Sequence, residues 1–88
     1  MASRLPRILA DVAAERGRQV KLWGEQNHDP IGWLPIFVEE VGEIAKAINE
    51  NNLLSYREEL IHAAAVAVAA VEAFDRQLEA AVSEPLDA

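Results

Sequence analysis

Residues 35–62 read PIFVEEVGEIAKAINENNLLSYREELIH, and this stretch decides the fold. Apolar side chains recur in its first half at the three- and four-residue spacing of an amphipathic helix, which predicts a helix from about Pro35 to Glu50. Asn49 to Asn52 supply a stop, and a second helical pattern follows within a few residues. A connection this short joins antiparallel neighbours, so the stretch predicts a helical hairpin. The apolar face of its first helix consists of Phe37, Val38, Val41, Ile44, Ala45 and Ile48.

A further helix is predicted before the hairpin. Apolar residues at mostly helical spacing place it from about Pro6 to Leu22, with Ser3 in position to cap it. Glycine and proline then cluster between Gly24 and Pro35, and such clusters mark turns and loops. We therefore expect one long loop between the first helix and the hairpin.

The last predicted helix begins at Ser55. Its hydroxyl, with Glu58 three residues later, has the form of a capping box, which marks a helix start. Alanine and valine continue the helical pattern to about Val82, and Pro85 is expected to end it. Residues 1–88 are thus predicted to form a single all-α domain with three main helices per chain.

The overall charge limits the classes of partner. The 88 residues carry a formal net charge of −7 and are 51% hydrophobic, a combination that favours a folded acidic protein over a disordered one. Duplex nucleic acid and anionic membranes are normally met by basic surfaces, so neither is an expected partner. Half of the eight Lys and Arg residues nevertheless lie in the first eighteen positions, which leaves a local basic surface open. These are Arg4, Arg7, Arg16 and Arg18.

Cysteine content and apolar runs bear on where the protein works. The chain has no cysteine, which excludes disulfides and thiolate metal sites. The longest apolar run, Ala63 to Val71, has nine residues, against the roughly 20 that a bilayer span needs. The N-terminal region also lacks the continuous apolar segment of a secretory signal. A cytoplasmic location is therefore expected.

The run from Ala63 to Val71 also bears on assembly. It contains no charged residue, so a helix through it is apolar all round and needs cover on every side. Three helices from so short a chain supply too little cover. This predicts a homo-oligomer, a dimer or a tetramer, that completes the hairpin into a helix bundle. The alternative is that alanine only stabilises an exposed helix through its high propensity.

Acidic residues gather on both helices of the predicted hairpin. Glu39, Glu40 and Glu43 cover one shoulder of the first helix, and Glu59 and His62 share a face of the second at i and i+3. An antiparallel hairpin can bring the two groups within reach of one ion. Carboxylates without thiols favour hard cations such as Mg²⁺ or Mn²⁺. A cluster that serves only solubility is the alternative.

Two ordered motifs give the acidic cluster a family context. The segment FVEEVGEI at residues 37–44, followed by Glu59 after a suitable gap, resembles the E-E-x-x-E and E-x-x-D signature of the MazG-like all-α nucleoside triphosphate pyrophosphohydrolases. Upstream, WGEQNH at residues 23–28 is similar to the stretch of tryptophan, glutamine and histidine that precedes the E-E-x-x-E helix in that family. Together the matches span about Trp23 to Val71.

The resemblance implies Mg²⁺-dependent hydrolysis of a nucleoside triphosphate between its α and β phosphates, giving a monophosphate and pyrophosphate. By motif position, Glu40, Glu43 and Glu59 are implied to be metal ligands, with His62 at the fourth ligand position. Glu39 is implied to be a ligand or the base that activates water.

The upstream motif implies a substrate-binding role for Trp23, Gln26 and His28, which would lie near the nucleotide. The segment from His28 to Glu39 is slightly longer than its counterpart in MazG itself. For Trp23, a role as a core anchor at the end of the first helix is an equal alternative.

His62 is where the sequence departs from the family pattern, because the motif has an aspartate there. Imidazole suits Mn²⁺ and softer metals better than Mg²⁺, and it removes one negative charge from the cluster. Three outcomes are open: altered metal preference with activity kept, weakened activity, or a nucleotide- and metal-binding or regulatory protein of the same fold. A histidine that serves only packing is a further alternative, as is a helical assembly domain without chemistry.

Overall fold

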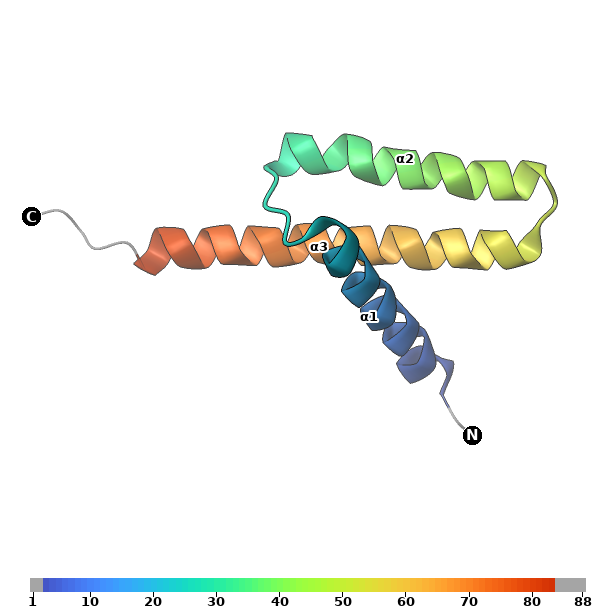
Figure 1. The fold of residues 1–88 in the computed structure, drawn as a ribbon, viewed down its shortest axis with the longest axis horizontal. Helices are drawn as coiled ribbons and strands as arrows, with labels where there is room; N and C mark the ends of the chain where they lie inside the picture. The colour runs from blue at the N-terminus through green and yellow to red at the C-terminus, as the bar shows by residue number, and fades with distance from the viewer. Residues whose placement is uncertain (1–2, 84–88) are drawn as a thin grey trace, which may run out of the picture.

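Three α-helices make up the part of the chain that the structure describes, residues 3–83 of a computed structural model (Figure 1). They are α1 (Arg4–Trp23), α2 (Pro30–Asn49) and α3 (Leu53–Ser83), and no β-strand occurs among these residues. The predicted all-α class with three helices is therefore confirmed. None of the described helices has both the length and the apolar character that a bilayer crossing requires.

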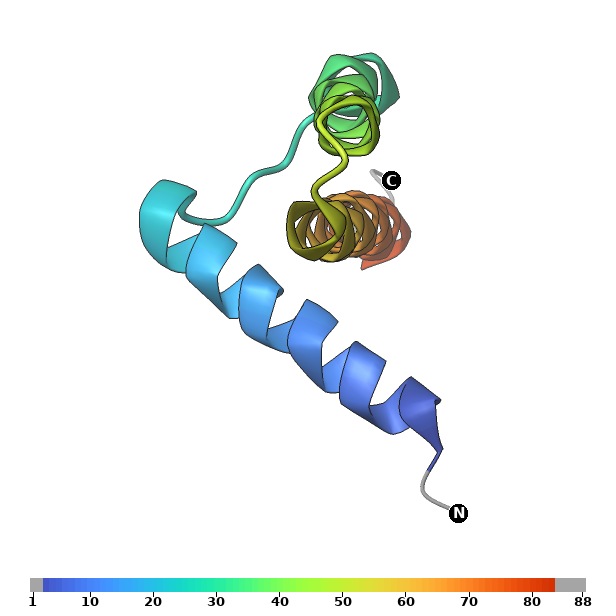
Figure 2. The same ribbon diagram turned by 90° about the vertical axis from the view of Figure 1, so that its right-hand side faces the viewer.

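α3 is the central helix of the fold. α2 runs antiparallel beside it, and α1 crosses it on another side, so that α3 lies between the two (Figures 1 and 2). Within residues 3–83, α1 and α2 do not pack on each other. The result is an elongated molecule, 61 × 35 × 21 Å, in which one helix joins two others.

Both ends of α1 are defined by local hydrogen bonds. Ser3 Oγ accepts a hydrogen bond from the backbone N–H of Leu5 at 3.3 Å, so Ser3 caps the helix as predicted. At the other end, Gly24 adopts a φ of +72°, a conformation that residues with a Cβ rarely adopt. Its N–H donates to the Val20 carbonyl at 2.8 Å, which ends the helix.

α2 begins at Pro30, five residues before the predicted start at Pro35. Asp29 caps it, because its Oδ1 accepts a hydrogen bond from the Gly32 N–H at 2.8 Å. Pro30 then occupies the first turn, where its missing N–H breaks no helical bond, and Pro35 lies inside the helix. The prediction of a long loop reaching Pro35 is therefore wrong. Either proline could stand in the first turn of a helix. The cap formed by the Asp29 side chain places the start of α2 at Pro30.

α3 begins at Leu53, two residues before the predicted start at Ser55. Asn52 Oδ1 accepts a hydrogen bond from the Ser55 N–H at 3.1 Å, so Asn52 has the capping role. The predicted capping box of Ser55 and Glu58 is wrong for this reason. Asn51 just before it has a φ of +55°, and asparagine tolerates this conformation better than most residues.

The far end of α3 lies near the predicted position. The helix is described to Ser83, against a predicted end at about Val82, and Pro85 lies outside the described residues.

The interior of the chain is small. Its main cluster combines Trp33 of α2 with Val66, Ala69 and Ala73 of α3. Among the described residues, no large side chain is fully buried, whereas twenty large hydrophobic side chains are exposed. A core of this size is marginal for independent stability.

The alanine-rich run from Ala63 to Val71 is covered on some sides only. Ala63, Ala65, Val66 and Ala69 are buried against the neighbouring helices. Val68 and Val71 are 41% and 58% exposed. One chain therefore covers this run incompletely, as the sequence led us to expect.

Two stripes of exposed apolar residues run along α2 and α3. They repeat mostly at intervals of three and four residues, the spacing of helices that pack on other helices. Leu34 of α2 lines one groove together with Ala67, Val71 and Phe74 of α3, so the two stripes meet at this groove. We call the two stripes the apolar face: Ile31, Leu34, Val38, Val41, Ala45 and Ile48 of α2, and Leu60, Ala67, Val71, Phe74 and Leu78 of α3.

Candidate metal centre

Three ionisable side chains from two helices meet between α2 and α3. Glu40 lies on α2, and Glu59 and His62 lie one turn apart on α3. One possible ligand atom of each lies within 4.8 Å of the other two. Metal–ligand bonds to oxygen and nitrogen are about 2.0–2.2 Å long, so small side-chain rotations suffice to bring all three onto one cation. The antiparallel pairing thus brings together three of the four predicted metal ligands.

Glu40 is the least satisfied of the three. Its Oε2 is buried and has no hydrogen-bond partner among the described residues. Burial raises the pKa of this carboxyl above its ordinary value, and the neighbouring Glu59 carboxylate adds to the effect. A cation between Glu40 and Glu59 would stabilise both ionised carboxylates and give the buried oxygen a partner.

His62 and Glu59 are in direct contact. Nδ1 of His62 lies 3.3 Å from Oε2 of Glu59, and both side chains are about one-fifth exposed. Nε2, on the other side of the ring, lies 3.9 Å from Glu58 and 3.8 Å from Glu15. His62 is therefore surrounded by carboxylates and does not serve only as an apolar packing residue.

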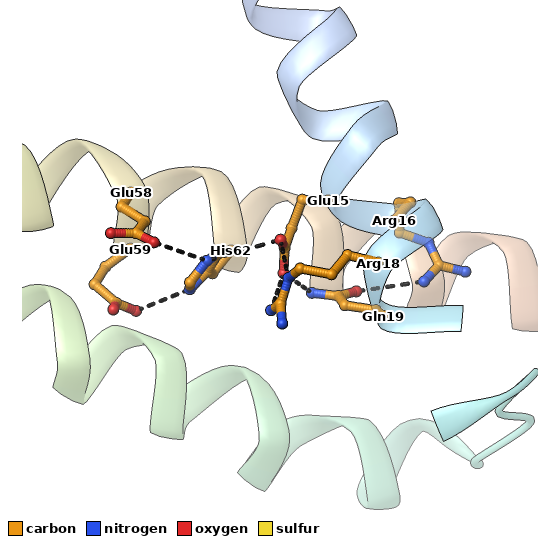
Figure 3. A network of polar contacts seen from close by, with 7 residues as sticks. All are labelled: Glu15, Arg16, Arg18, Gln19, Glu58, Glu59 and His62. Atoms are coloured by element: carbon orange, nitrogen blue, oxygen red, sulfur yellow. Dashed lines mark hydrogen bonds and ion pairs between the residues drawn. The ribbon is translucent and has the colours of Figure 1, made fainter. Parts of the chain in front are cut away.

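Glu15 of α1 is the residue at this site that the sequence analysis missed. It is only 8% exposed, and Arg18 donates two hydrogen bonds of 2.6 Å to its carboxylate. Gln19 donates a third at 3.2 Å. The bond from Arg18 is the main reason that the pKa of Glu15 lies below its ordinary value, despite the opposing effect of burial. Figure 3 shows these α1 side chains pointing toward His62.

A sequence signal for Glu15 did exist. Val12, Glu15 and Gln19 follow one another at three and four residues, and all three are buried against α3. A carboxylate within a buried stripe needs a charged or hydrogen-bonding partner, and Arg18 stands at i+3. We call the whole group the polar junction: Glu15, Arg18, Glu40, Glu58, Glu59 and His62.

Glu39 and Glu43 lie outside the three-residue group. Glu39 is exposed on α2. Glu43 lines a shallow hollow together with Glu59, near the turn between α2 and α3. Lys46, which could have neutralised Glu43, lies 4.0 Å from Glu50 instead. Glu43 thus neighbours the proposed ligand Glu59 without joining Glu40 and His62.

The predicted substrate residues lie along a different part of α3. The backbone carbonyl of Gln26 accepts a hydrogen bond from Arg76 at 3.2 Å, and that of His28 accepts one from Gln77 at 3.3 Å. Arg76 follows His62 by fourteen residues, which is about 21 Å along a helix. Within one chain, this segment is therefore not brought to the acidic group.

Trp23 and His28 have contrasting surroundings. Trp23 is 59% exposed, so it is not the core anchor that the sequence left open. His28 packs edge-on against Trp33, with ring centroids 4.9 Å apart, and Trp33 is the tryptophan of the core. Nε2 of His28 and Nε1 of Trp33 are both buried without a hydrogen-bond partner among the described residues. Both residues border the groove beside the apolar face.

Comparison with known proteins does not assign the chain to a family. Models of protein families, curated proteins and solved structures were all compared with it, and none matches.

Proposed function

We propose that this protein is a metal-dependent nucleotide pyrophosphohydrolase that converts a nucleoside triphosphate to a monophosphate and pyrophosphate. The observation that carries the proposal is the grouping of Glu40, Glu59 and His62, with a buried Glu40 oxygen that lacks a partner. The motif resemblance of residues 23–71 to the MazG-like enzymes supplies the reaction. A cytoplasmic location, where nucleotide pools lie, accords with this function.

The proposed ligand set consists of Glu40, Glu59 and His62, with Glu43 as a fourth. Glu43 lines the same hollow as Glu59, so it stands next to the group. A bound Mg²⁺ or Mn²⁺ would neutralise phosphate charge and lower the pKa of a nearby water molecule. Waters and phosphate oxygens complete the coordination of such ions.

The proposed reaction adds water across the bond between the α-phosphorus and the oxygen that it shares with the β-phosphorus. The water oxygen bonds to the α-phosphorus, that P–O bond breaks, and pyrophosphate leaves. The proton from water passes to a carboxylate and then to solvent. Glu39, next to Glu40 and exposed to solvent, is the proposed base.

His62 favours one specific alternative, a protein that binds metal and nucleotide without hydrolysing the nucleotide. Its ring nitrogens face Glu59 on one side and Glu15 on the other. A site with an imidazole ligand prefers Mn²⁺ over Mg²⁺ relative to an all-carboxylate site. Product formation separates the enzyme from this binding or regulatory protein.

We also propose that a second copy of the chain covers the apolar face. Both stripes have the spacing that packs helix against helix, and so the same face can pair with itself about a two-fold axis. The small interior of one chain supports the idea, because nine of its twenty exposed large hydrophobic side chains lie on this face and would be covered together. A dimer meets this need, and a tetramer would extend it.

The experiment that tests the function measures pyrophosphate release from a panel of nucleoside triphosphates, with Mg²⁺ and separately with Mn²⁺. We expect release in at least one condition, and loss of at least about a hundredfold in Glu40→Gln, since even second-shell changes cost 10–100-fold at metal sites. Glu79→Gln, an exposed carboxylate near the far end of α3, is the matched control. Full activity in Glu40→Gln would contradict the site.

A separate measurement distinguishes the enzyme and the metal-binding protein, on the one hand, from a helical assembly domain that binds no metal, on the other. Binding of Mn²⁺ is measured directly for the wild-type protein and for Glu40→Gln. An acidic surface that serves only solubility would bind Mn²⁺ equally weakly in both proteins.

A further inference from the structure

Two adjoining hollows lie between α1 and the first half of α3, and three arginine side chains line one of them. Arg4 and Arg7 of α1 and Arg57 of α3 line one hollow together with Asp11. An adjoining hollow is lined by Asp11 and Arg57 again, and also by Arg18, His62 and two glutamates, Glu15 and Glu58. The two hollows share Asp11 and Arg57, so they meet at this ion pair, and together we call them the α1–α3 cleft.

Arginines are concentrated in this cleft, although the protein is acidic and Asp11, Glu15 and Glu58 also line it. The chain has eight Lys and Arg residues and a net charge of −7, yet four of the eight cations line the two hollows. Arg18 is committed to Glu15 by two hydrogen bonds. Arg4 and Arg7 form no ion pair with any residue in the range 3–83. The cleft therefore holds two cations whose charge is not used within the described chain.

Arg57 is held weakly. Its Nη2 lies 2.8 Å from Asp11 Oδ2, but the two side chains are 58% and 49% exposed. Exposed ion pairs of this kind contribute little to stability, so an incoming anion can replace Asp11 as the partner of the guanidinium.

Phosphate chemistry fits these residues. Guanidinium groups bind phosphate oxygens through paired hydrogen bonds, and an acidic protein repels a polyanion unless cations meet it locally. Asp11 and Glu15 are one turn apart on α1, about 6 Å along the axis, and Glu15 lies 3.8 Å from His62, so the arginine hollow lies about one helical turn from a proposed metal ligand. A divalent cation offsets only part of the charge of a nucleoside triphosphate.

We infer that the α1–α3 cleft binds the phosphate chain of the nucleotide, with Arg57 and Arg7 as phosphate-binding residues and Arg4 beside them. This rests on the proposed function for the identity of the substrate. It adds a second site, apart from the metal ligands, at which polyphosphate is recognised. Asp11 occupies Arg57 when no phosphate is bound.

The test measures binding of inorganic tripolyphosphate to the full chain by calorimetry, with a chelator present so that no divalent metal takes part. Arg7→Gln is expected to raise the Kd for tripolyphosphate about tenfold, because it removes one charge-assisted hydrogen-bonding contact. A tenfold change in Kd corresponds to about 1.4 kcal/mol. Arg7 forms no ion pair with the residues that the structure describes, so we expect its substitution to leave the fold intact. Lys21→Gln, an exposed cation at the end of α1, is the charge-matched control and should bind as the wild type does.

Two further variants sharpen the test. Asp11→Asn removes the competitor of Arg57 and should tighten tripolyphosphate binding severalfold. Arg57→Gln should weaken binding as Arg7→Gln does, and Arg57→Lys checks that any loss is not due to misfolding. Equal binding by Arg7→Gln, Arg57→Gln and Lys21→Gln would overturn the inference, as would equally weak binding by all proteins including the wild type.

The outcome is independent of catalysis. If tripolyphosphate binding depends on Arg7 and Arg57 but no nucleotide is hydrolysed, the phosphate site stands and the pyrophosphohydrolase proposal fails. If hydrolysis requires Glu40 but is indifferent to both arginines, the function stands and the cleft is not the phosphate site. A nucleoside triphosphate analogue with a non-hydrolysable α–β bridge, tested beside tripolyphosphate, distinguishes nucleotide from free polyphosphate as the ligand.

Discussion

The polar junction and the apolar face are built on the same central helix, yet they differ in how far one chain completes them. At the polar junction, α1 and α2 bring carboxylates to His62 from two sides, and Glu15 has its partner Arg18 at 2.6 Å. On the apolar face, side chains such as Ile31 and Val71 remain 81% and 58% exposed. The difference teaches that one chain brings the polar groups of the junction together while leaving much of its apolar face exposed, and this exposed face is where the proposed second copy would bind.

The largest expected effect comes from breaking the apolar face. Val71→Glu places a charge in the middle of it, at a position that is exposed in the single chain, so the helix itself tolerates the change. Burying an unpaired charge at an interface costs several kcal/mol, and we expect the oligomer to dissociate. Light scattering coupled to size exclusion would show the fall in mass.

The control for the apolar face is Leu5→Glu, at an equally exposed position on α1. It lies off the face and should leave the mass unchanged. A wild-type protein that is monomeric at all concentrations would contradict the proposed assembly.

A smaller effect is expected at His62, where the polar junction departs from the MazG-like pattern. His62→Asp supplies a hard oxygen ligand, which favours Mg²⁺ over Mn²⁺. The ratio of pyrophosphate release with Mg²⁺ to that with Mn²⁺ should therefore rise about tenfold, which corresponds to a shift of about 1.4 kcal/mol in metal preference. Parallel assays with the two metals check this. A fall with both metals would show that imidazole contributes in a way that a carboxylate cannot replace.

Glu15→Gln should lower stability by about 1–2 kcal/mol, because it removes the ion pair with Arg18 and leaves a nearly buried amide. The pKa of Glu15 lies below its ordinary value of 4.5, so its contribution is fully present above that pH and is lost as pH falls through the lowered value. Denaturant unfolding at several pH values should therefore show wild type and variant converging in acid. Asp75→Asn, exposed on α3, should show no such convergence.

The smallest effect concerns Glu40 in the absence of metal. Because burial raises its pKa, the folded chain holds a proton on Glu40 that the unfolded chain has already released, and so this group lowers stability as pH rises above 4.5. Glu40→Gln should therefore be more stable than wild type at neutral pH with a chelator present, and the gap should close in acid. Thermal unfolding measures both. A variant that is less stable at neutral pH would show that the Glu40 carboxylate is well satisfied without metal.

Local patterns predicted the hairpin well and its boundaries less well. The spacing of Val41, Ile44 and Ile48 identifies a helix, and the short turn after it leaves α3 only an antiparallel course. The predicted starts of α2 and α3 were wrong by five and two residues. Proline suits the first turn of a helix at position 30 as well as at 35, and Asn52 suits a cap as well as Ser55 does. Only the hydrogen bonds of Asp29 and Asn52 decide between them.

The site was predictable to the extent that it lies on the hairpin. The meeting of Glu40 with Glu59 and His62 follows from two adjacent helices whose register is set by a short turn. The spacing of Glu15 could have indicated that it lies on the buried face of α1, but its position beside His62 could not be predicted. That position depends on the angle at which α1 crosses α3, and no periodicity in the sequence encodes that angle. For the same reason, the distance between His28 and the acidic group was not foreseen.

The measurement that tests the central claim most directly is calorimetric titration of the protein with Mn²⁺. We predict saturable binding in the wild type and in Glu79→Gln, and a loss of at least about a hundredfold in Glu40→Gln, since the carboxylate removed is a direct ligand. Binding to all three proteins with the same affinity, or to none of them, would contradict the assignment of Glu40, Glu59 and His62 as a metal centre.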